Sequence, residues 1–444
     1  MFSVLANRTY RQLFLAQMIA LVGTGLATVA LGLLAYEIAG ANAGAVLGTA
    51  MAIKMVAYIG VAPLVGAYAS RLPRRSFLVA MDVIRALVAM ALPFVDQIWQ
   101  IYVLIFVLQS ASAGFTPTFQ ATIPDVLPEE KDYTKALSLS RLAYDMESLT
   151  SPMLAAALLT VMNFHWLFSG TAVGFAGSAL LVLATTLPRS AARRSGGGIY
   201  GNTTRGARLY LKTPRLRGLL AVTLAAAAAS AMVIVNTPVL IQSALGLGQS
   251  SMAITLAAFG GGSMLAALLL PRLLERLSDR IVMLSAASVM TIALAALAVS
   301  WSNHASPSYW GVILAGWFVL GIAYSASVTP GGRLLRRSSV EEDRPALFAA
   351  QFALSHVCWL AAYPLAGQIG ALGGMGSAFG ASAMLALVGT VIAFRIWPKE
   401  DVEVLAHSHD DLSADHPHIL QGHPDGRANH AYVIDALHPH WPIK

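Results

Sequence analysis

The chain has 444 residues, of which 57% are hydrophobic and only 11% are charged. Because an ordinary globular domain is about a quarter charged, this composition excludes a typical water-soluble protein and predicts a surface that faces lipid. The net charge of +7 would indicate nucleic-acid binding only if the basic residues formed one patch, and the single cysteine, Cys358, excludes a disulfide framework and a multi-cysteine metal cluster.

Twelve stretches are long and apolar enough to cross a bilayer, which takes about 20 residues of helix. We therefore predict an all-α polytopic membrane protein with twelve transmembrane helices. In chain order, the predicted spans are residues 12–36, 44–69, 76–95, 99–123, 136–162, 166–187, 218–243, 250–270, 281–301, 309–330, 346–370 and 375–397.

The connectors between these spans differ sharply in basic residues. Lys and Arg are absent from residues 37–43, 96–98, 163–165, 244–249, 302–308 and 371–374, and gather in the alternate connectors. Short loops that keep Lys and Arg stay in the cytoplasm. The pattern predicts a multi-pass plasma-membrane protein with both termini in the cytoplasm.

The spans fall into two groups of six. We predict an N-terminal six-helix bundle at 1–187, a cytoplasmic linker at 188–217, a C-terminal six-helix bundle at 218–397 and a flexible tail rich in His and Asp at 398–444. Parallel repeats of this kind place a substrate site at mid-membrane in many secondary transporters. The chain has no Walker A sequence, and we expect neither an enzyme nor a resident cofactor, and a monomer.

The connector after the second span carries a motif. Gly66, Arg71, Arg74 and Arg75 match the signature loop of the major facilitator superfamily, which the chain resembles over residues 1–397, although Ser70 replaces the usual acid. The resemblance implies two six-helix bundles and a charge lock at this loop. Asp82 and Arg85, three residues apart on one predicted helix, are expected to form a structural ion pair, and the alternative is that they substitute for this lock. Residues 123–130 (Ile-Pro-Asp-Val-Leu-Pro-Glu-Glu) are similar to the helix four to five connection of bacterial efflux members.

Four ionisable residues lie near the middle of their predicted spans: Lys54, Asp145, Glu147 and His356. A charge at this depth is costly and indicates a functional site. Asp145 lies four residues from Arg141, on one helix face, so that pair is expected to be structural.

Glu147 is assigned to the cavity as a protonatable or cation-binding carboxylate, and it shares a helix face with Tyr144. Lys54 either takes part in transport or neutralises one of the acids. His356 is either packed between helices or carries a proton.

Neutral polar side chains at similar depth complete a candidate cavity. These are Gln17, Gln109, Ser112, Tyr144, Asn236 and Gln351. The alternative for each is a hydrogen bond that joins two helices.

The tail contains eight of the eleven histidines, at His407, His409, His416, His418, His423, His430, His438 and His440. In an extended chain, residues i and i+2 point the same way, so each His-x-His pair is expected to bind a divalent ion such as Ni, Co or Zn. The alternative is a hydrophilic tail or a partial pH sensor.

A permease with such a tail resembles the bacterial nickel and cobalt resistance permeases, which implies proton-coupled export of those ions. Two alternatives stay open at this point. One is a proton-coupled exporter of drugs, siderophores or other small organic molecules, and the other is a transporter-like metal sensor.

Overall fold

The structure is a computed structural model that describes residues 2–39, 43–68, 72–188, 199–301, 306–399, 404–408, 427–434, 438 and 441. The first half contains six long helices: α1 (Arg8–Ala39), α2 (Ala43–Tyr68), α3 (Arg74–Ala91), α4 (Ile98–Val126), α5 (Glu130–Leu159) and α6 (His165–Leu183). The second half contains α7 (Ile199–Lys212), α8 (Pro214–Pro238), α9 (Gln249–Leu273), α10 (Asp279–Ser300), α11 (Trp310–Val328), α12 (Gly331–Arg337) and α13 (Arg344–Ile396). Two short strands follow, β1 (Val404–Ser408) and β2 (Arg427–Ala431).

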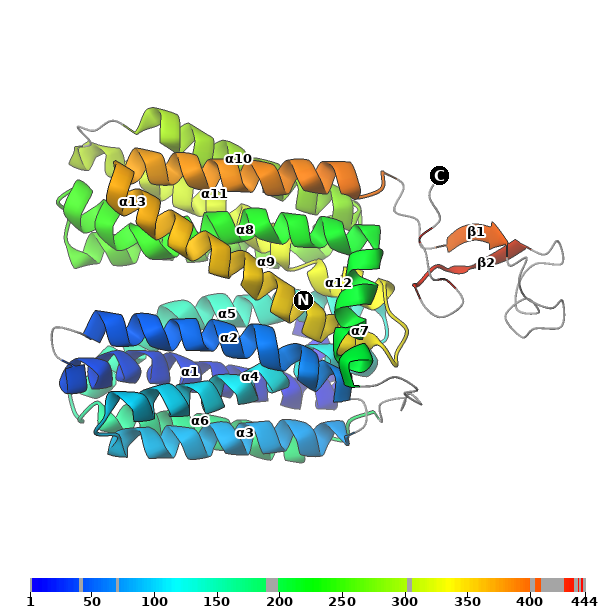
Figure 1. The fold of residues 1–444 in the computed structure, drawn as a ribbon, viewed down its shortest axis with the longest axis horizontal. Coiled ribbons are helices and arrows are strands. Elements are labelled where there is room, and N and C mark those ends of the chain that lie inside the picture. Colours follow the sequence, from blue (N-terminus) through cyan, green and yellow to red (C-terminus); the bar gives the residue numbers. More distant parts are fainter. Residues whose placement is uncertain are drawn as a thin grey trace.

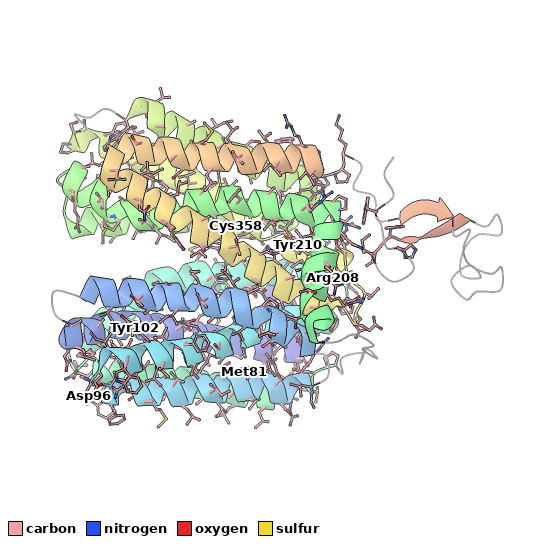
Figure 2. The ribbon with its side chains drawn as sticks, in the orientation of Figure 1. Met81, Asp96, Tyr102, Arg208, Tyr210 and Cys358 are labelled. Carbon is pink, nitrogen blue, oxygen red and sulfur yellow. The ribbon has the colours of Figure 1, made fainter. Side chains whose placement is uncertain are left out.

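The helices form two bundles that lie side by side as two layers (Figure 1). Helices α1–α6 make one layer and α8–α13 the other, while α7 crosses between them at one end. We call that end, where α7 and α12 lie, the linker side, and the opposite end the far side. Figure 2 shows Arg208 and Tyr210 at the linker side and Asp96 and Tyr102 at the far side.

The prediction of twelve crossings in two bundles is confirmed. Ten helices are long and apolar enough to cross a membrane by length and composition. Helix α13 contains two of the predicted spans, because Gly374 has a φ of 77° and breaks it there, in a region that favours glycine. Helix α5 is the twelfth, and it is less apolar because it carries Arg141, Asp145 and Glu147.

Local sequence explains where several helices begin. Ser278 caps α10 by accepting a hydrogen bond from the backbone of Ile281, and Pro214 occupies the first turn of α8, where its missing N–H costs nothing. Glu130 and Asp132 lie in the first turn of α5, where the helix dipole favours negative charge. These signals set the starts of the helices at the linker side.

Each bundle has its own apolar core, and its outer faces stay apolar as well. Val173 and Leu180 on α6 and Ile292 on α10 keep 70%, 66% and 66% of their surface exposed. A water-soluble protein rarely leaves many such side chains exposed over wide areas. These outer faces therefore fit contact with lipid.

Two elements differ from the sequence expectation. The predicted linker contains the amphipathic helix α7, and α8 begins at Pro214, before the predicted start of the C-terminal bundle at residue 218. The tail is not flexible throughout, because β1 and β2 pair antiparallel. Beyond them, Tyr432 and Trp441 pack on the buried Arg215 of α8.

Helices α9 and α11 approach each other at two glycines. A Cβ on Gly262 would lie 2.1 Å from the carbonyl oxygen of Phe318, and a Cβ on Gly321 would lie 2.0 Å from that of Phe259. Both contacts are with backbone, which cannot move aside. The neighbouring Gly261 faces open space.

We predict that Gly262→Ala destabilises the protein by about 1 to 3 kcal/mol through overpacking. Gly261→Ala is the matched control and is expected to stabilise the helix by about 0.5 to 1 kcal/mol. Thermal unfolding of the two variants in detergent measures the difference. Equal melting temperatures would contradict the close α9–α11 contact.

Candidate functional site

A cavity of about 650 Å³ lies between the two bundles, and we call it the central cavity. Helices α1, α2, α4 and α5 line it from one bundle and α8, α11, α12 and α13 from the other. Five of the sequence-predicted site residues line this cavity: Gln17, Lys54, Tyr144, Gln351 and His356. Arg141 lines it too.

A second cavity of about 360 Å³ is lined by helices of the N-terminal bundle and by Phe352 of α13, and we call it the N-bundle cavity. Its wall contains Glu147, Gln109, Ser112 and Arg85. The two cavities adjoin, because both are lined by Gln17, Lys54, Thr116, Phe119, Tyr144 and Phe352. Lys54 is thus common to both.

Asp145 does not line either cavity. It forms an ion pair with Arg141 one turn away on α5 and accepts a hydrogen bond of 2.6 Å from Ser263 on α9. The Arg141 guanidinium also donates to Ser263 at 3.2 Å and lies 4.9 Å from the ring centre of Tyr324 on α11. This group of residues joins the two bundles inside the membrane.

Asp82 and Arg85 also form a buried ion pair, within α3. Asp82 accepts a hydrogen bond of 2.7 Å from Ser178. The Arg85 guanidinium lies between the rings of Phe115 and Phe175, at 4.1 and 4.5 Å from their centres. The pair holds the N-terminal bundle together and makes no lock between bundles.

Lys54 and Glu147 differ from these paired charges. No ion pair with a described residue holds either of them within 4.0 Å, and the Lys54 ammonium lies 5.4 Å from the ring centre of Tyr58. Glu147 lies against α1, where a Cβ on Gly25 would come within 2.6 Å of its Oε1. The absence of a side chain at Gly25 makes room for the carboxylate.

His356 belongs to an aromatic stripe on α13. Phe352, His356, Trp359 and Tyr363 all line the central cavity and follow one helix face. Tyr58 of α2 packs edge-on against His356, with ring centres 4.6 Å apart. The Nδ1 of His356 lies 2.7 Å from the carbonyl oxygen of Phe352, which can only accept a hydrogen bond, so Nδ1 carries the proton.

The neutral polar residues divide between cavity and packing. Gln17 accepts a hydrogen bond from Ser140 at 3.1 Å, and Gln351 accepts one from Tyr210 of α7. Asn236 was expected in the cavity, but it is buried and donates 3.1 Å to the carbonyl oxygen of Ala366. It therefore joins α8 to α13 and lines neither cavity.

Asp125, at the end of α4, places a buried carboxylate beside the loop motif. It pairs with Arg74 of α3 and with Arg344 at the start of α13. One buried carboxylate thus bridges the two bundles at the linker side. Asp82 and Arg85 take no part in this bridge and form their own ion pair within α3.

The remaining motif residues contribute unequally. A Cβ on Gly66 would lie 2.4 Å from the Cβ of Ala349, so this glycine permits close contact between α2 and α13. Arg75 is exposed, and Arg71 lies outside the described residues.

Helix α12 adds further contacts between bundles. Arg333 pairs with Glu130 of α5 and lies 3.0 Å from Asp279 of α10, while Arg336 donates to the carbonyl oxygen of Pro128. Lys131 and Glu275 form another pair at 3.0 Å, and this contact lowers the pKa of the exposed Glu275 carboxyl. Because α12 also forms part of the wall, these contacts close the central cavity at the linker side.

Most of the predicted metal ligands of the tail lie outside the described residues: His409, His416, His418, His423 and His440. For His407 and His430 the structure gives the backbone, in β1 and β2. His438 is buried against the ring of Tyr432, with centres 4.7 Å apart. Metal binding by the tail stays a prediction.

The Asp125 bridge and the aromatic stripe were not predicted from the sequence. Asp125 lies inside the connection 123–130, but nothing in the sequence links it to Arg344. The stripe could have been predicted, because residues 352, 356, 359 and 363 are spaced so that they share one face of a helix.

The sequence profile of the Major Facilitator Superfamily matches residues 13–248 and 219–410. Macrolide efflux protein A of Enterococcus faecalis is 24% identical over 153 residues, which are 32% of this chain and 47% of that protein. Multidrug resistance protein MdtG of Dickeya zeae is 28% identical over 162 residues, which are 36% of this chain and 40% of that protein. The chain therefore spans less than half of the length of these relatives.

Solved structures share the fold at low identity. The human organic anion transporter MFSD10 superposes with a TM-score of 0.73 at 13% identity, covering 87% of this chain and 99% of that one. A bacterial homologue of the iron transporter ferroportin, in an outward-facing state, gives 0.74 at 14% identity, covering 87% and 98%. None of these relatives and structures supports the resemblance to nickel and cobalt permeases.

We predict that Asp125→Asn opens the linker side. Loss of one partner of a buried ion pair costs about 3 to 5 kcal/mol, enough to shift a two-state equilibrium roughly a hundredfold or more. The measurement is labelling of Ser355→Cys, in a Cys358→Ala background, by an impermeant thiol reagent applied from the linker side.

The matched control is Asp132→Asn, which removes a pair with Lys135 inside one turn of α5 and leaves the contacts between bundles in place. Asp125→Asn is expected to raise the labelling rate and Asp132→Asn to leave it unchanged. Equal rates would show that Asp125 does not hold the linker side closed.

Proposed function

The chain belongs to the Major Facilitator Superfamily, and we propose that it exports small organic molecules across the membrane, coupled to protons, by alternating access. It is a membrane transporter and not an enzyme. The linker side, which carries the basic loops, faces the cytoplasm in this proposal. The two relatives named for macrolide efflux and multidrug resistance favour the outward direction.

The central cavity is the observation that carries this proposal. A volume of about 650 Å³ lined by Phe352, Trp359, Tyr363 and Tyr324 suits a drug-sized molecule. It lies between two bundles whose ion pairs close one side. A cavity between two rigid halves is the arrangement that lets rocking expose one site to each side in turn.

The same walls argue against a bare metal ion as the substrate. Nickel, cobalt and zinc bind imidazole and carboxylate ligands together. In the described parts of the chain, no three His, Cys, Asp or Glu side chains gather in a way that could hold a metal ion. The described lining of the central cavity contains His356 but no Asp or Glu.

The ion pairs at the linker side open and close the central cavity in the proposed transport cycle. In the present state, Asp125 and α12 close the cytoplasmic side. Loading from the cytoplasm requires these ion pairs to separate, and release on the far side requires them to form again. The ion pairs are therefore separated in the state that is open to the cytoplasm and formed in the state that is open to the far side.

Glu147 is proposed to carry the proton. Its ionised form balances the Lys54 charge across the N-bundle cavity, and a proton removes that balance. The bound molecule and the proton would then use Glu147 in alternate halves of the cycle, which is the requirement for exchange.

We predict that Glu147→Gln abolishes proton-driven export in inverted vesicles, because the amide cannot bind or release the proton. Glu37→Gln, at an exposed position near the far end of α1, is the matched control and is expected to export normally. Membrane insertion is checked by the amount of each variant in the vesicles. Wild-type export by Glu147→Gln would remove this residue from the coupling.

The substrate class can be tested by growth. Cells that express the chain are expected to tolerate dyes and antibiotics and to show no change in a nickel, cobalt and zinc series. Tolerance to metals alone would favour the nickel and cobalt hypothesis, and tolerance to neither would favour a sensor.

A further inference from the structure

The two cavities contain one positive and one negative charge that are not held by an ion pair. Most charged groups in the described part of the membrane region are paired, such as Arg141 with Asp145 and Arg85 with Asp82. Lys54 and Glu147 have no ion-pair partner within 4.0 Å among the described residues. A charge inside the membrane without such a partner is costly, so these two are available to a ligand.

The two charges lie in a defined order along the cavities. Glu147 lines only the N-bundle cavity, Lys54 lines both cavities, and the aromatic stripe of α13 lines the central cavity. A molecule that extends from one cavity into the other therefore meets an acid, then a base, then aromatic rings.

Several polar groups of the two cavity walls already make hydrogen bonds within the protein. The hydroxyls of Thr24 and Thr28 donate to carbonyl oxygens of their own helix at 2.9 Å. The Trp359 indole N–H donates to Ser230 at 2.8 Å, and Nδ1 of His356 bonds Phe352. The stripe therefore offers mainly apolar ring faces, and Glu147 and Lys54 are the charged groups of the two cavity walls that no described ion pair holds.

We propose that the exported molecule is a zwitterion with an apolar aromatic part. Its basic amine binds Glu147 in the N-bundle cavity, its acidic group binds Lys54 where the cavities adjoin, and its apolar part packs on Phe352, Trp359 and Tyr363. This inference rests on the proposed function and adds the charge class of the substrate.

A zwitterion neutralises both cavity charges at once. A simple anion would be repelled by the negative charge of Glu147, and a simple cation would be repelled by the positive charge of Lys54. The amine also explains exchange with protons, because protonation of Glu147 removes the partner of the amine and releases it. An anion alone would bind best together with the proton, which does not give exchange.

The test uses one ring system in four charge states. The probes are 2-naphthylalanine (zwitterion), its methyl ester (cation), its N-acetyl derivative (anion) and the N-acetyl methyl ester (neutral), all assayed in a medium acidic enough to keep the amine of the ester protonated. Proton-driven uptake of each is measured in inverted vesicles that contain the wild-type chain. The zwitterion is expected to exceed each of the other three roughly tenfold or more, the factor that one charge-assisted hydrogen bond supplies.

Lys54→Gln tests the contact with the acidic group of the substrate separately from the contact with its amine. It is expected to lower uptake of the zwitterion to the level of the methyl ester, while uptake of the ester itself persists and shows that the variant is folded. Lys54→Arg keeps the charge and is expected to retain the preference for the zwitterion. Lys399→Gln removes an exposed charge beyond α13 and is expected to change nothing.

Three results would overturn the inference. These are equal uptake of all four probes, preference for the ester or the N-acetyl derivative, and uptake of none of them by vesicles that still export dyes. In that last case the proposed function stands, because dye export persists. Failure of the wild-type chain to export any organic molecule would instead overturn both the proposed function and the inference.

Discussion

The cost of an ionised side chain inside a membrane governs this structure. An ionised side chain at the bilayer centre is either neutralised by a partner of opposite charge or retained for a function. This chain contains both kinds. Asp82 with Arg85 and Asp145 with Arg141 neutralise each other and join neighbouring helices. Lys54 and Glu147 are left facing adjoining cavities. The proposed substrate and proton chemistry follows from this division between paired and available charges.

The same electrostatics act differently at the linker side. There, Asp125 holds Arg74 of its own bundle and Arg344 of the other, and Arg333 does the reverse with Asp279 and Glu130. Buried ion pairs add little net stability because desolvation offsets their attraction. Contacts of this kind suit a closure that must form and separate in every cycle. The glycine contacts inside one bundle, such as Gly262 on the backbone of Phe318, do not involve charge and keep that bundle rigid.

Much of the fold could be predicted from the sequence, because apolar length and basic loops are local properties. The pairing of Arg141 with Asp145 follows from a spacing of four residues on one helix. Contacts between distant segments could not be predicted: Asp125 meets Arg344 only after the bundles pack. Asn236 is a packing residue for the same reason, since its acceptor is the backbone of Ala366. The strands β1 and β2 were missed because 18 residues separate them and neither is apolar enough to indicate a strand.

The central claim is that the proton and the exported molecule compete for Glu147. Proton release on substrate binding tests it directly, by calorimetry of the purified protein in buffers of different ionisation enthalpy. The account predicts that binding displaces close to one proton from the wild-type chain when Glu147 starts protonated, and none from Glu147→Gln. Binding that displaces no proton from the wild type, or the same number from both proteins, would contradict it.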